Sequence, residues 1–210
     1  MSGVLGRLLE YWSGLPRCGE SLLPARVALH PCELFELMPR MALLKRLDRY
    51  NVQVSMMNLT NSNLLHNPLL GINAFDLTAP AFRECRAEFY EAVLDQPAVA
   101  HLRETVRQQN GKPANVKSLY LPLADRNGQP TYIIACTVYE KRHKHSGIND
   151  RLVMDHANVR GVRFIDIGGG IPTMRFANPL THTAKFAENR WWDRFVPARR
   201  KTEAPEFRNN

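Results

Sequence analysis

The residues most capable of chemistry lie late in the chain, where an apolar run meets three consecutive glycines. Val162 to Ile167 has the pattern of a short strand, and Gly168 to Gly170 follow it directly. A glycine turn after a strand lets backbone N–H groups approach a phosphate-bearing cofactor, provided that a helix begins there. Here Pro172 follows, and only 40 residues remain after Gly170, too few for the alternating strands and helices of a nucleotide-binding sheet. The pattern therefore favours a strand that ends in a tight turn.

A second group with possible chemistry is the pair His143 and His145, whose imidazoles would share one side of an extended segment. No cysteine or carboxylate stands at zinc-ligand spacing, and Lys141, Arg142 and Lys144 would repel a metal ion. A solvated basic linker is the simpler interpretation. Spacing alone assembles neither a Ser/His/Asp triad nor a pair of catalytic carboxylates, so the sequence predicts no enzyme. A small-molecule enzyme that uses the glycine turn at 166–170 as methyltransferases do is the alternative.

The composition is that of an intracellular globular protein, with 44% apolar and 23% charged residues. The four cysteines show no Cys-x-x-Cys pair and no disulfide-like spacing, which predicts reduced thiols and a cytoplasmic location. No apolar run reaches the roughly 20 residues that a membrane-spanning helix needs. Arg7 and Glu10 interrupt the apolar stretch near the N-terminus, so this stretch does not have the pattern of a signal peptide.

Positive charge is concentrated in the last third of the chain. Residues 141–210 hold 14 Lys and Arg against 7 Asp and Glu, so residues 1–140 carry only +1 of the net charge of +8. A nearly neutral core argues against nucleic-acid binding by that part of the chain. The tail mixes aromatic and basic residues, which suits an acidic protein partner or weak association with a membrane surface. The candidate docking residues of the tail are Trp191, Trp192, Arg199 and Arg200.

The elements that precede this tail form an α+β set. Residues 115–140 predict a hairpin, because two alternating apolar runs face each other across Asn127-Gly128, a dipeptide that favours a tight turn. Strands are also expected at 41–47, 50–57 and 99–108. The alternating positions that we expect to share one core face of the hairpin are Leu119, Leu121, Leu123, Tyr132, Ile134, Cys136 and Val138.

Two helices are expected, one across a face of the sheet and one that covers apolar surface outside the sheet core. Pro80 suits the first turn of a helix over residues 80–96, whose buried stripe would be Phe82, Cys85, Phe89 and Val93. Near the N-terminus, Leu5, Leu8, Leu9 and Trp12 recur at helical spacing. Each large apolar side chain left in water costs about 1.5–3 kcal/mol, so this helix should cover apolar surface in its own chain or in a homodimer. Leu5, Leu8 and Trp12 are therefore candidate partner-docking residues.

The predicted organisation is one domain with extensions. Residues 1–40 form the N-terminal helix and a connector, 41–140 the core, 141–176 a linker with an extra strand, and 177–210 a basic aromatic tail. The core is predicted to be a single antiparallel sheet with the helix 80–96 across one face. Pro122 lies inside a predicted strand and cannot donate a ladder hydrogen bond, so a bulge or an interrupted ladder is expected there.

This order of elements, together with several short motifs, resembles a family of stand-alone bacterial PAS-like proteins that lack an attached effector domain. The similarity covers residues 3–172. Its motifs are Leu9-x-Tyr11-Trp12, Leu23-Pro24-Ala25-Arg26, His30-Pro31, Gly71-Ile72-Asn73-Ala74-Phe75-Asp76-Leu77, Leu121-Pro122-Leu123 and Phe164-Ile165-Asp166-Ile167-Gly168. Asn58-Leu59 and approximately His66 stand where the family usually carries Gly-Thr and a further Gly.

The resemblance implies a five-stranded PAS-like sheet, a sensory or regulatory role, dimerisation through flanking helices, and a ligand pocket beneath the connector and the long helix. The residues that could line the pocket are Met57, Asn58, Asn63, Phe82, Phe89, Tyr132 and Ile134. The same residues could instead fill the core of a purely structural adaptor. The sequence assigns no cofactor, because the helix 80–96 has no histidine to bind haem and the connector has no Asn-Cys-Arg motif to bind flavin.

Overall fold

The computed structural model describes residues 3–17, 19, 21–57, 71–76, 78, 80–108, 113–140 and 152–174. It shows one antiparallel sheet with the strand order β2-β1-β5-β4-β3-β6. The strands are β1 Met41–Asp48, β2 Asn51–Met57, β3 Ala98–Gln108, β4 Pro113–Ala124, β5 Pro130–Tyr139 and β6 Leu152–Asp166. The α-helices are α1 Val4–Gly14 and α2 Arg83–Leu94, and the short 3-10 helices are Arg26–Ala28, Met38–Arg40 and Pro80–Phe82.

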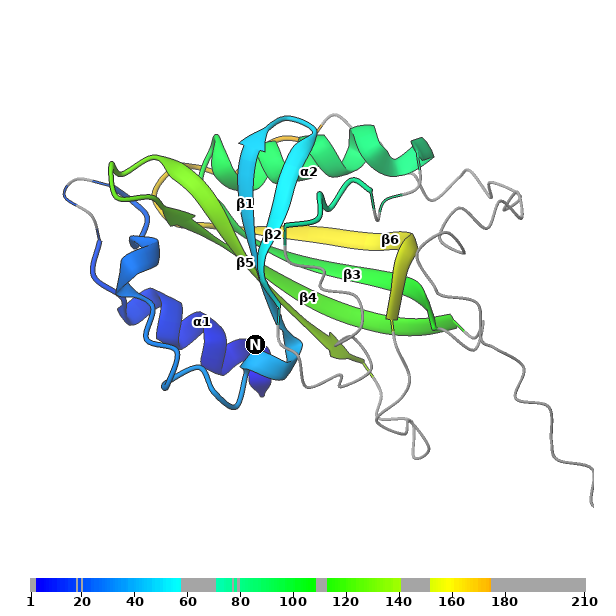
Figure 1. The fold of residues 1–210 in the computed structure, drawn as a ribbon, viewed down its shortest axis with the longest axis horizontal. Helices are drawn as coiled ribbons and strands as arrows, with labels where there is room; N and C mark the ends of the chain where they lie inside the picture. Colours follow the sequence, from blue (N-terminus) through cyan, green and yellow to red (C-terminus); the bar gives the residue numbers. More distant parts are fainter. Residues whose placement is uncertain are drawn as a thin grey trace, which may run out of the picture.

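The α+β antiparallel architecture is confirmed, with two differences from the expectation. The sheet has six strands rather than five, because β6 is much longer than the predicted run Val162 to Ile167 and pairs with β3 along most of its length. The N-terminal helix was expected to cover apolar surface outside the sheet core, but it packs on the sheet itself. Helix α2 packs on one face as expected, whereas α1 covers part of the opposite face (Figure 1).

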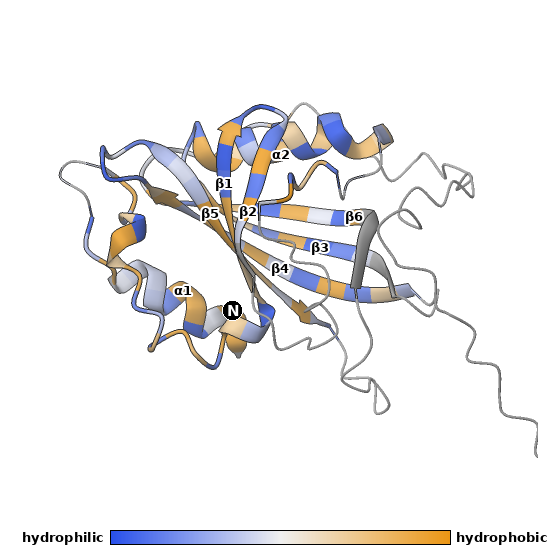
Figure 2. Ribbon diagram, in the orientation of Figure 1, coloured by the Kyte–Doolittle hydropathy of each residue, from blue (hydrophilic) through white to orange (hydrophobic). Residues whose placement is uncertain are grey.

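Two hydrophobic cores result from the alternation of side chains along the strands, which is visible as alternating colours in Figure 2. Leu119, Leu121 and Ile134 belong to the core beneath α1, whereas Tyr120 and Ile133 belong to the core beneath α2. The expected common face of the β4–β5 hairpin is confirmed, and α1 of the same chain covers it. The N-terminal helix therefore buries its apolar stripe in cis.

The connector fastens α1 to the end of β4. The indole Nε1 of Trp12 donates a buried hydrogen bond of 2.9 Å to the carbonyl of Pro122, and the N–H of Ala124 donates to the carbonyl of Pro24. Pro122 remains in register with Ile133 of β5, and the only nearby register shift follows one residue later, after Leu123. The pairing between β3 and β4 ends at Tyr120. Pro122 therefore lies beyond the residues that pair with β3, and its missing N–H removes no hydrogen bond to that strand.

Asn73 and three backbone hydrogen bonds hold the segment 71–76 against β2. The side-chain Oδ1 of Asn73 accepts from the N–H groups of Val52 and Phe75, and its Nδ2 donates to the carbonyl of Tyr50. These bonds dock the segment 71–76 along β2 and bury Phe75 beneath α2. The motif that begins at Gly71 is therefore structural in this chain, with Gly71 at a φ of 82°.

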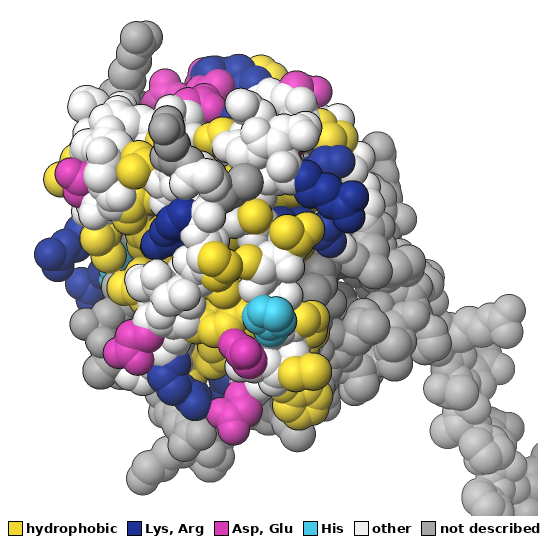
Figure 3. Space-filling view, turned by 90° about the vertical axis from the view of Figure 1, so that its left-hand side faces the viewer, with side chains coloured by type: hydrophobic (Ala, Val, Ile, Leu, Met, Phe, Trp, Pro, Cys, Tyr) yellow, Lys and Arg dark blue, Asp and Glu magenta, His cyan; other side chains and the backbone are white. Residues whose placement is uncertain are grey.

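The face formed by the β4–β5 turn and the connector is shown in Figure 3. Hydrophobic side chains gather along its centre, with charged side chains around them. The exposed apolar side chains of the connector include Val27 and Phe35. No helix in the described part of the chain has the length and apolar character that a membrane crossing requires.

Candidate functional site

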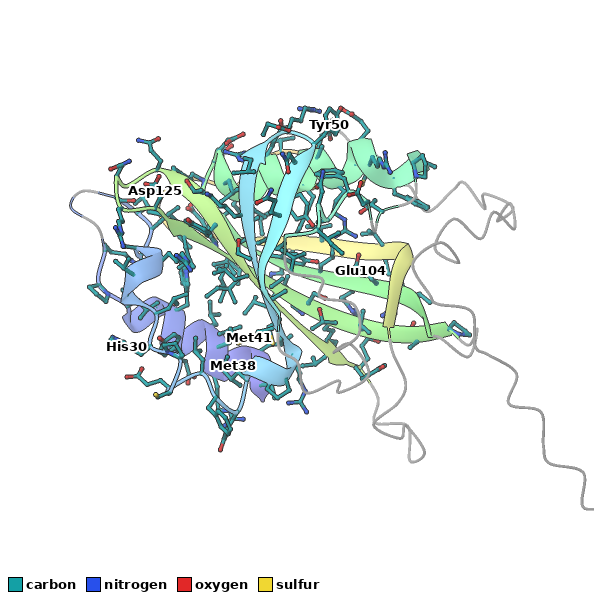
Figure 4. The ribbon with its side chains drawn as sticks, in the orientation of Figure 1. His30, Met38, Met41, Tyr50, Glu104 and Asp125 are labelled. Carbon is teal, nitrogen blue, oxygen red and sulfur yellow. The ribbon has the colours of Figure 1, made fainter. Side chains whose placement is uncertain are left out.

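A buried ion pair lies between α2 and the sheet. Arg86, on the inner side of α2, places Nη2 3.1 Å from Oε1 of Glu104 on β3, and Glu104 is completely buried. The Nη1 atom of Arg86 lies 3.5 Å from the hydroxyl of Tyr120 on β4. Figure 4 places Glu104 within the sheet, far from His30 and Met38 of the connector. We call Arg86, Glu104, Tyr120 and Tyr90 the α2 polar cluster.

The secondary structure explains how these side chains meet. On β3, Leu102 and Glu104 are two residues apart and therefore point to the same face of the sheet, towards α2. On α2, Arg86 and Tyr90 are four residues apart and lie on the same side of the helix. The ring of Phe89 packs edge-on against that of Tyr120, with a centroid distance of 4.8 Å. An apolar, aromatic setting thus surrounds one cation and one carboxylate.

The ionisation of the α2 polar cluster follows from this setting. Burial lowers the pKa of Arg86, but the charge of Glu104 and nearby groups outweigh it, so the pKa ends above its usual value. Burial and the Glu104 carboxylate both raise the pKa of Tyr120, and burial raises that of Tyr90. The guanidinium is therefore charged and both phenols are neutral near neutral pH.

One oxygen of this cluster lacks a partner among the described residues. Oε2 of Glu104 is buried without a hydrogen bond, and so is Oε2 of Glu88 on the same helix as Arg86. A buried acceptor without a donor costs about 1–3 kcal/mol, so such atoms are uncommon in folded proteins. The arrangement can accept a hydrogen bond from a small donor while Arg86 holds the carboxylate in place.

The structure does not bring the sequence-predicted pocket residues together. Phe89 lies in the core beneath α2, and Phe82, in a 3-10 helix, is half-buried. Tyr132 and Ile134 face the opposite way, into the core beneath α1. Met57 ends β2, but its side chain lies outside the described residues, as do Asn58 and Asn63 entirely. Of the four candidates whose side chains the structure describes, Phe89 is the one with ring contacts to the α2 polar cluster, at Tyr90 and Tyr120.

Sequence reasoning missed Arg86, Glu104 and Tyr120, although signals for two of them exist. The stripe of the long helix was drawn through Cys85, whereas the buried face runs one residue further on, through Arg86 and Ala87. Glu104 stands two residues after the buried Leu102 in an alternating strand, where a charge at a core-facing position is itself a signal.

The cysteines are less informative: Cys136 is buried, which raises the pKa of its thiol to about 11.

The partner-docking candidates of the first helix are not on the surface. Leu5, Leu8 and Trp12 are 4%, 0% and 2% exposed, because they pack on β4 and β5 of the same chain. These three side chains therefore offer no free docking surface in this structure. The other four candidates, Trp191, Trp192, Arg199 and Arg200, lie outside the described residues.

In the glycine turn, the backbone N–H groups that a phosphate would need are already hydrogen-bonded to Asp166. Oδ1 of Asp166 accepts hydrogen bonds from the N–H groups of Gly168 at 2.8 Å and Gly170 at 2.9 Å. A Cβ atom on Gly169 would lie 3.2 Å from the carbonyl oxygen of Pro97, so the turn packs closely against the start of β3. The geometry is that of a tight turn that ends the strand. Within the described ranges, no group of three or more His, Cys, Asp or Glu could hold a metal ion.

Comparison with known proteins gives a match to one family model, that of the PAS domain, over residues 2–138. Among solved structures, that of an RsLOV variant shares 18% identity with a TM-score of 0.36, and the alignment covers 54% of this chain and 72% of that one. A search of curated proteins finds no match. The family match spans more than half of the chain and includes α1, α2 and five of the six strands, and on this ground the protein belongs to the PAS domain family.

Proposed function

We propose that this chain is a non-enzymatic sensory module whose α2 polar cluster binds a small polar ligand between α2 and β3. Membership of the PAS family supports a sensory or regulatory role. The observation that carries the ligand proposal is the completely buried Glu104, whose Oε1 pairs with Arg86 while its Oε2 has no hydrogen-bond partner among the described residues. The expected ligand donates a hydrogen bond to that oxygen.

The chemistry of the pair favours recognition over stabilisation. Taking two charges out of water is expensive, and a buried ion pair often stabilises a fold no better than apolar residues of similar size. A residue pair that is costly to bury and still has an open acceptor is suited to a molecule that completes its hydrogen bonding. General acid–base catalysis is most efficient when the pKa of the catalytic group lies near the working pH, and the pKa values of Arg86, Tyr90 and Tyr120 are all shifted upwards, away from neutral pH.

A signal from this site would leave through α2. Arg49, in the turn between β1 and β2, forms ion pairs with Glu84 and Glu91 of α2, and Arg46 of β1 forms one with Asp95 at the end of the helix. These exposed pairs contribute little to stability and can exchange partners readily. A ligand that shifts Arg86 would move the helix against the β1–β2 hairpin. We include in this proposal that the movement of α2 is passed on to a signalling partner or to a second copy of the chain.

Native mass spectrometry of the purified full-length protein tests the ligand proposal. We expect a bound small molecule on the wild-type protein and its loss from the Glu104→Gln variant, which keeps the shape of the side chain but removes the charge that pairs with Arg86. Glu36→Gln is the matched control, because Glu36 is exposed and its ion-pair partner among the described residues is Arg7. A ligand retained equally by both variants would place the binding site elsewhere.

A structural adaptor with a filled core is the second candidate, and the aromatic packing beneath α2 favours it. Phe75 makes edge contacts with Tyr50 and Tyr90, and Phe89 makes one with Tyr120. If the wild-type protein carries no added mass and no tested small molecule raises its melting temperature, the adaptor is the better description. Binding of S-adenosylmethionine would instead revive the enzyme alternative.

A further inference from the structure

A cavity of about 650 Å³ lies on the face of the sheet opposite α2, beneath the start of α1. The N-terminal end of α1 points towards the part of the sheet that contains β3 and β6 (Figure 1). The residues that line the cavity are Val4, Leu5, Leu9, His101, Lys117, Val138, Tyr139, Glu140, Arg163 and Ile165.

The lining divides into an apolar side and a cationic side. Val4, Leu5 and Leu9 of α1 form an apolar wall, which Val138 and Ile165 extend on the sheet. His101 on β3, Lys117 on β4 and Arg163 on β6 come from three adjacent strands. A volume of this size with an apolar wall and a few polar groups is typical of a small-molecule site.

The register of the strands sets two cations, Arg103 and Lys117, directly opposite each other, and His101 lies directly opposite Arg163. Like charges at directly opposed positions destabilise a sheet. Glu140 is the only carboxylate in the lining, and it is already paired with Arg103 and Arg160 at 2.9 and 2.8 Å. Neither Lys117 nor Arg163 has an ion pair with any residue that the structure describes.

We propose that this cavity binds an amphipathic organic anion, a molecule with one carboxylate and a flexible apolar body. The carboxylate would lie between Lys117 and Arg163, and the apolar body would lie against Val4 and Leu9. Such a ligand supplies negative charge to Lys117 and Arg163 and covers the apolar wall at the same time. This site is separate from the α2 polar cluster, on the other face of the sheet, and does not depend on it.

His101 gives the proposed site a pH signature. Its pKa lies below the usual value because it is half-buried and because Lys117, Arg103 and Arg163 surround it, with Glu140 acting in the opposite direction. The side of the cavity formed by α1 contributes only apolar groups, Val4, Leu5 and Leu9. A bound carboxylate adds a negative charge beside the imidazole and raises its pKa, so binding takes up protons and strengthens as the pH falls through the pKa of His101 in the complex.

Isothermal titration calorimetry with decanoate, below its micelle concentration, tests the proposal on the full-length protein. We expect one site per chain, and an affinity about tenfold lower for Lys117→Gln or Arg163→Gln, because each loses a hydrogen bond between charged groups. Arg126→Gln is the matched control: it removes the same charge from the exposed β4–β5 turn, and its affinity should equal that of the wild type. Decanol, which keeps the apolar body and lacks the charge, should bind at least about tenfold more weakly.

Two further measurements, a melting temperature and a pH dependence of binding, distinguish a loss of binding from a loss of folding. Without ligand, Lys117→Gln should melt at the wild-type temperature or higher, because it removes a like-charge pair. His101→Gln should bind decanoate as the wild type does at pH 8 and lose the increase in affinity towards pH 5.5. No binding by the wild type, equal binding by all variants, or equal binding of decanol and decanoate would each overturn the proposal.

Discussion

Trp12 joins the first helix to the sheet in two ways, through the burial of its ring and through its indole N–H. The carbonyl of Pro122 that accepts this hydrogen bond is itself buried. We predict that Trp12→Phe lowers the free energy of unfolding by about 1–3 kcal/mol, because a buried acceptor loses its donor while most of the apolar contact remains.

Urea denaturation measures this loss, and Tyr11→Phe is the comparison. The Tyr11 hydroxyl accepts from the N–H of His30 at an exposed site, so water can replace it and the change should be smaller. Equal losses for the two variants would show that the indole hydrogen bond contributes little.

His101 predicts a pH dependence of stability in the ligand-free protein. Its pKa in the folded state is below the unfolded value of about 6.5, because burial and the neighbouring cations disfavour the imidazolium. The unfolded chain therefore binds more protons at this position, and stability rises with pH. The contribution is fully present above about pH 6.5 and is lost as the pH falls from there towards the folded-state pKa.

Melting temperatures of the wild type and His101→Gln, taken from pH 5 to 8, measure this contribution. The difference between the two proteins should be constant above about pH 7 and should shift in favour of the variant at lower pH. Parallel curves over the whole range would contradict the assignment to His101.

At the scale of single residues, the sequence predicted the positions that follow the alternation of a strand and missed the charged and polar residues that interrupt an apolar pattern. Leu119, Leu121 and Ile134 lie where alternation placed them. Alternation did not say which helix covers that face, so Tyr132 and Ile134 were assigned to the same pocket as Phe89 although they lie on the other side of the sheet. Which helix covers which face depends on long-range packing that one-dimensional periodicity does not contain.

Among the elements, α1 has the clearest energetic role, since it covers part of the sheet face opposite α2. We predict that Leu8→Ala destabilises the protein by about 2–5 kcal/mol, because Leu8 is completely buried between α1 and the sheet. Glu10→Ala, on the exposed side of the same helix, should change stability by less than about 0.5 kcal/mol. Chemical denaturation of both variants gives the comparison.

Starting the chain at Leu15 extends the test to the whole helix. Light scattering should show association of the shortened protein, because the apolar face around Leu119 and Leu121 becomes exposed. A shortened protein that stays monomeric with an unchanged melting temperature would mean that α1 does not protect this face.

Elements with strong local signals were predictable and one with a weak signal was not. The Asn127-Gly128 turn and the strands that it joins appear as expected, and Gly128 adopts a φ of 80°. The prediction for β6 included only its apolar end, because residues 152–161 mix polar and apolar types without a clear alternation. Their strand conformation comes from pairing with β3, which is a property of the sheet.

At the scale of the whole molecule, the charge is divided between a nearly neutral PAS core and a basic end. The tail remains the proposed docking segment for an acidic partner or an anionic membrane surface, with the fold-back of Trp191 and Trp192 onto the core as the competing proposal. We predict for the docking proposal that removing residues 183–210 leaves the melting temperature unchanged and abolishes a salt-sensitive interaction with anionic vesicles or an acidic protein.

The same truncation distinguishes the fold-back proposal from the docking proposal. If the tryptophans pack on the core, the shortened protein should melt at a lower temperature, and the fluorescence of the intact protein should be blue-shifted. An unchanged melting temperature without any lost interaction would contradict both proposals and leave the tail passive.

The hydrogen bond between Trp12 and Pro122 joins residues 110 positions apart, and this separation affects how the chain is made. At roughly 5–20 residues per second, a ribosome needs roughly 5–20 s to proceed from the helix to the strand that receives it. During that interval α1 has no sheet to pack on, and its apolar stripe is available to chaperones or to other nascent chains. The N-terminal helix is thus made first and reaches its final position among the last.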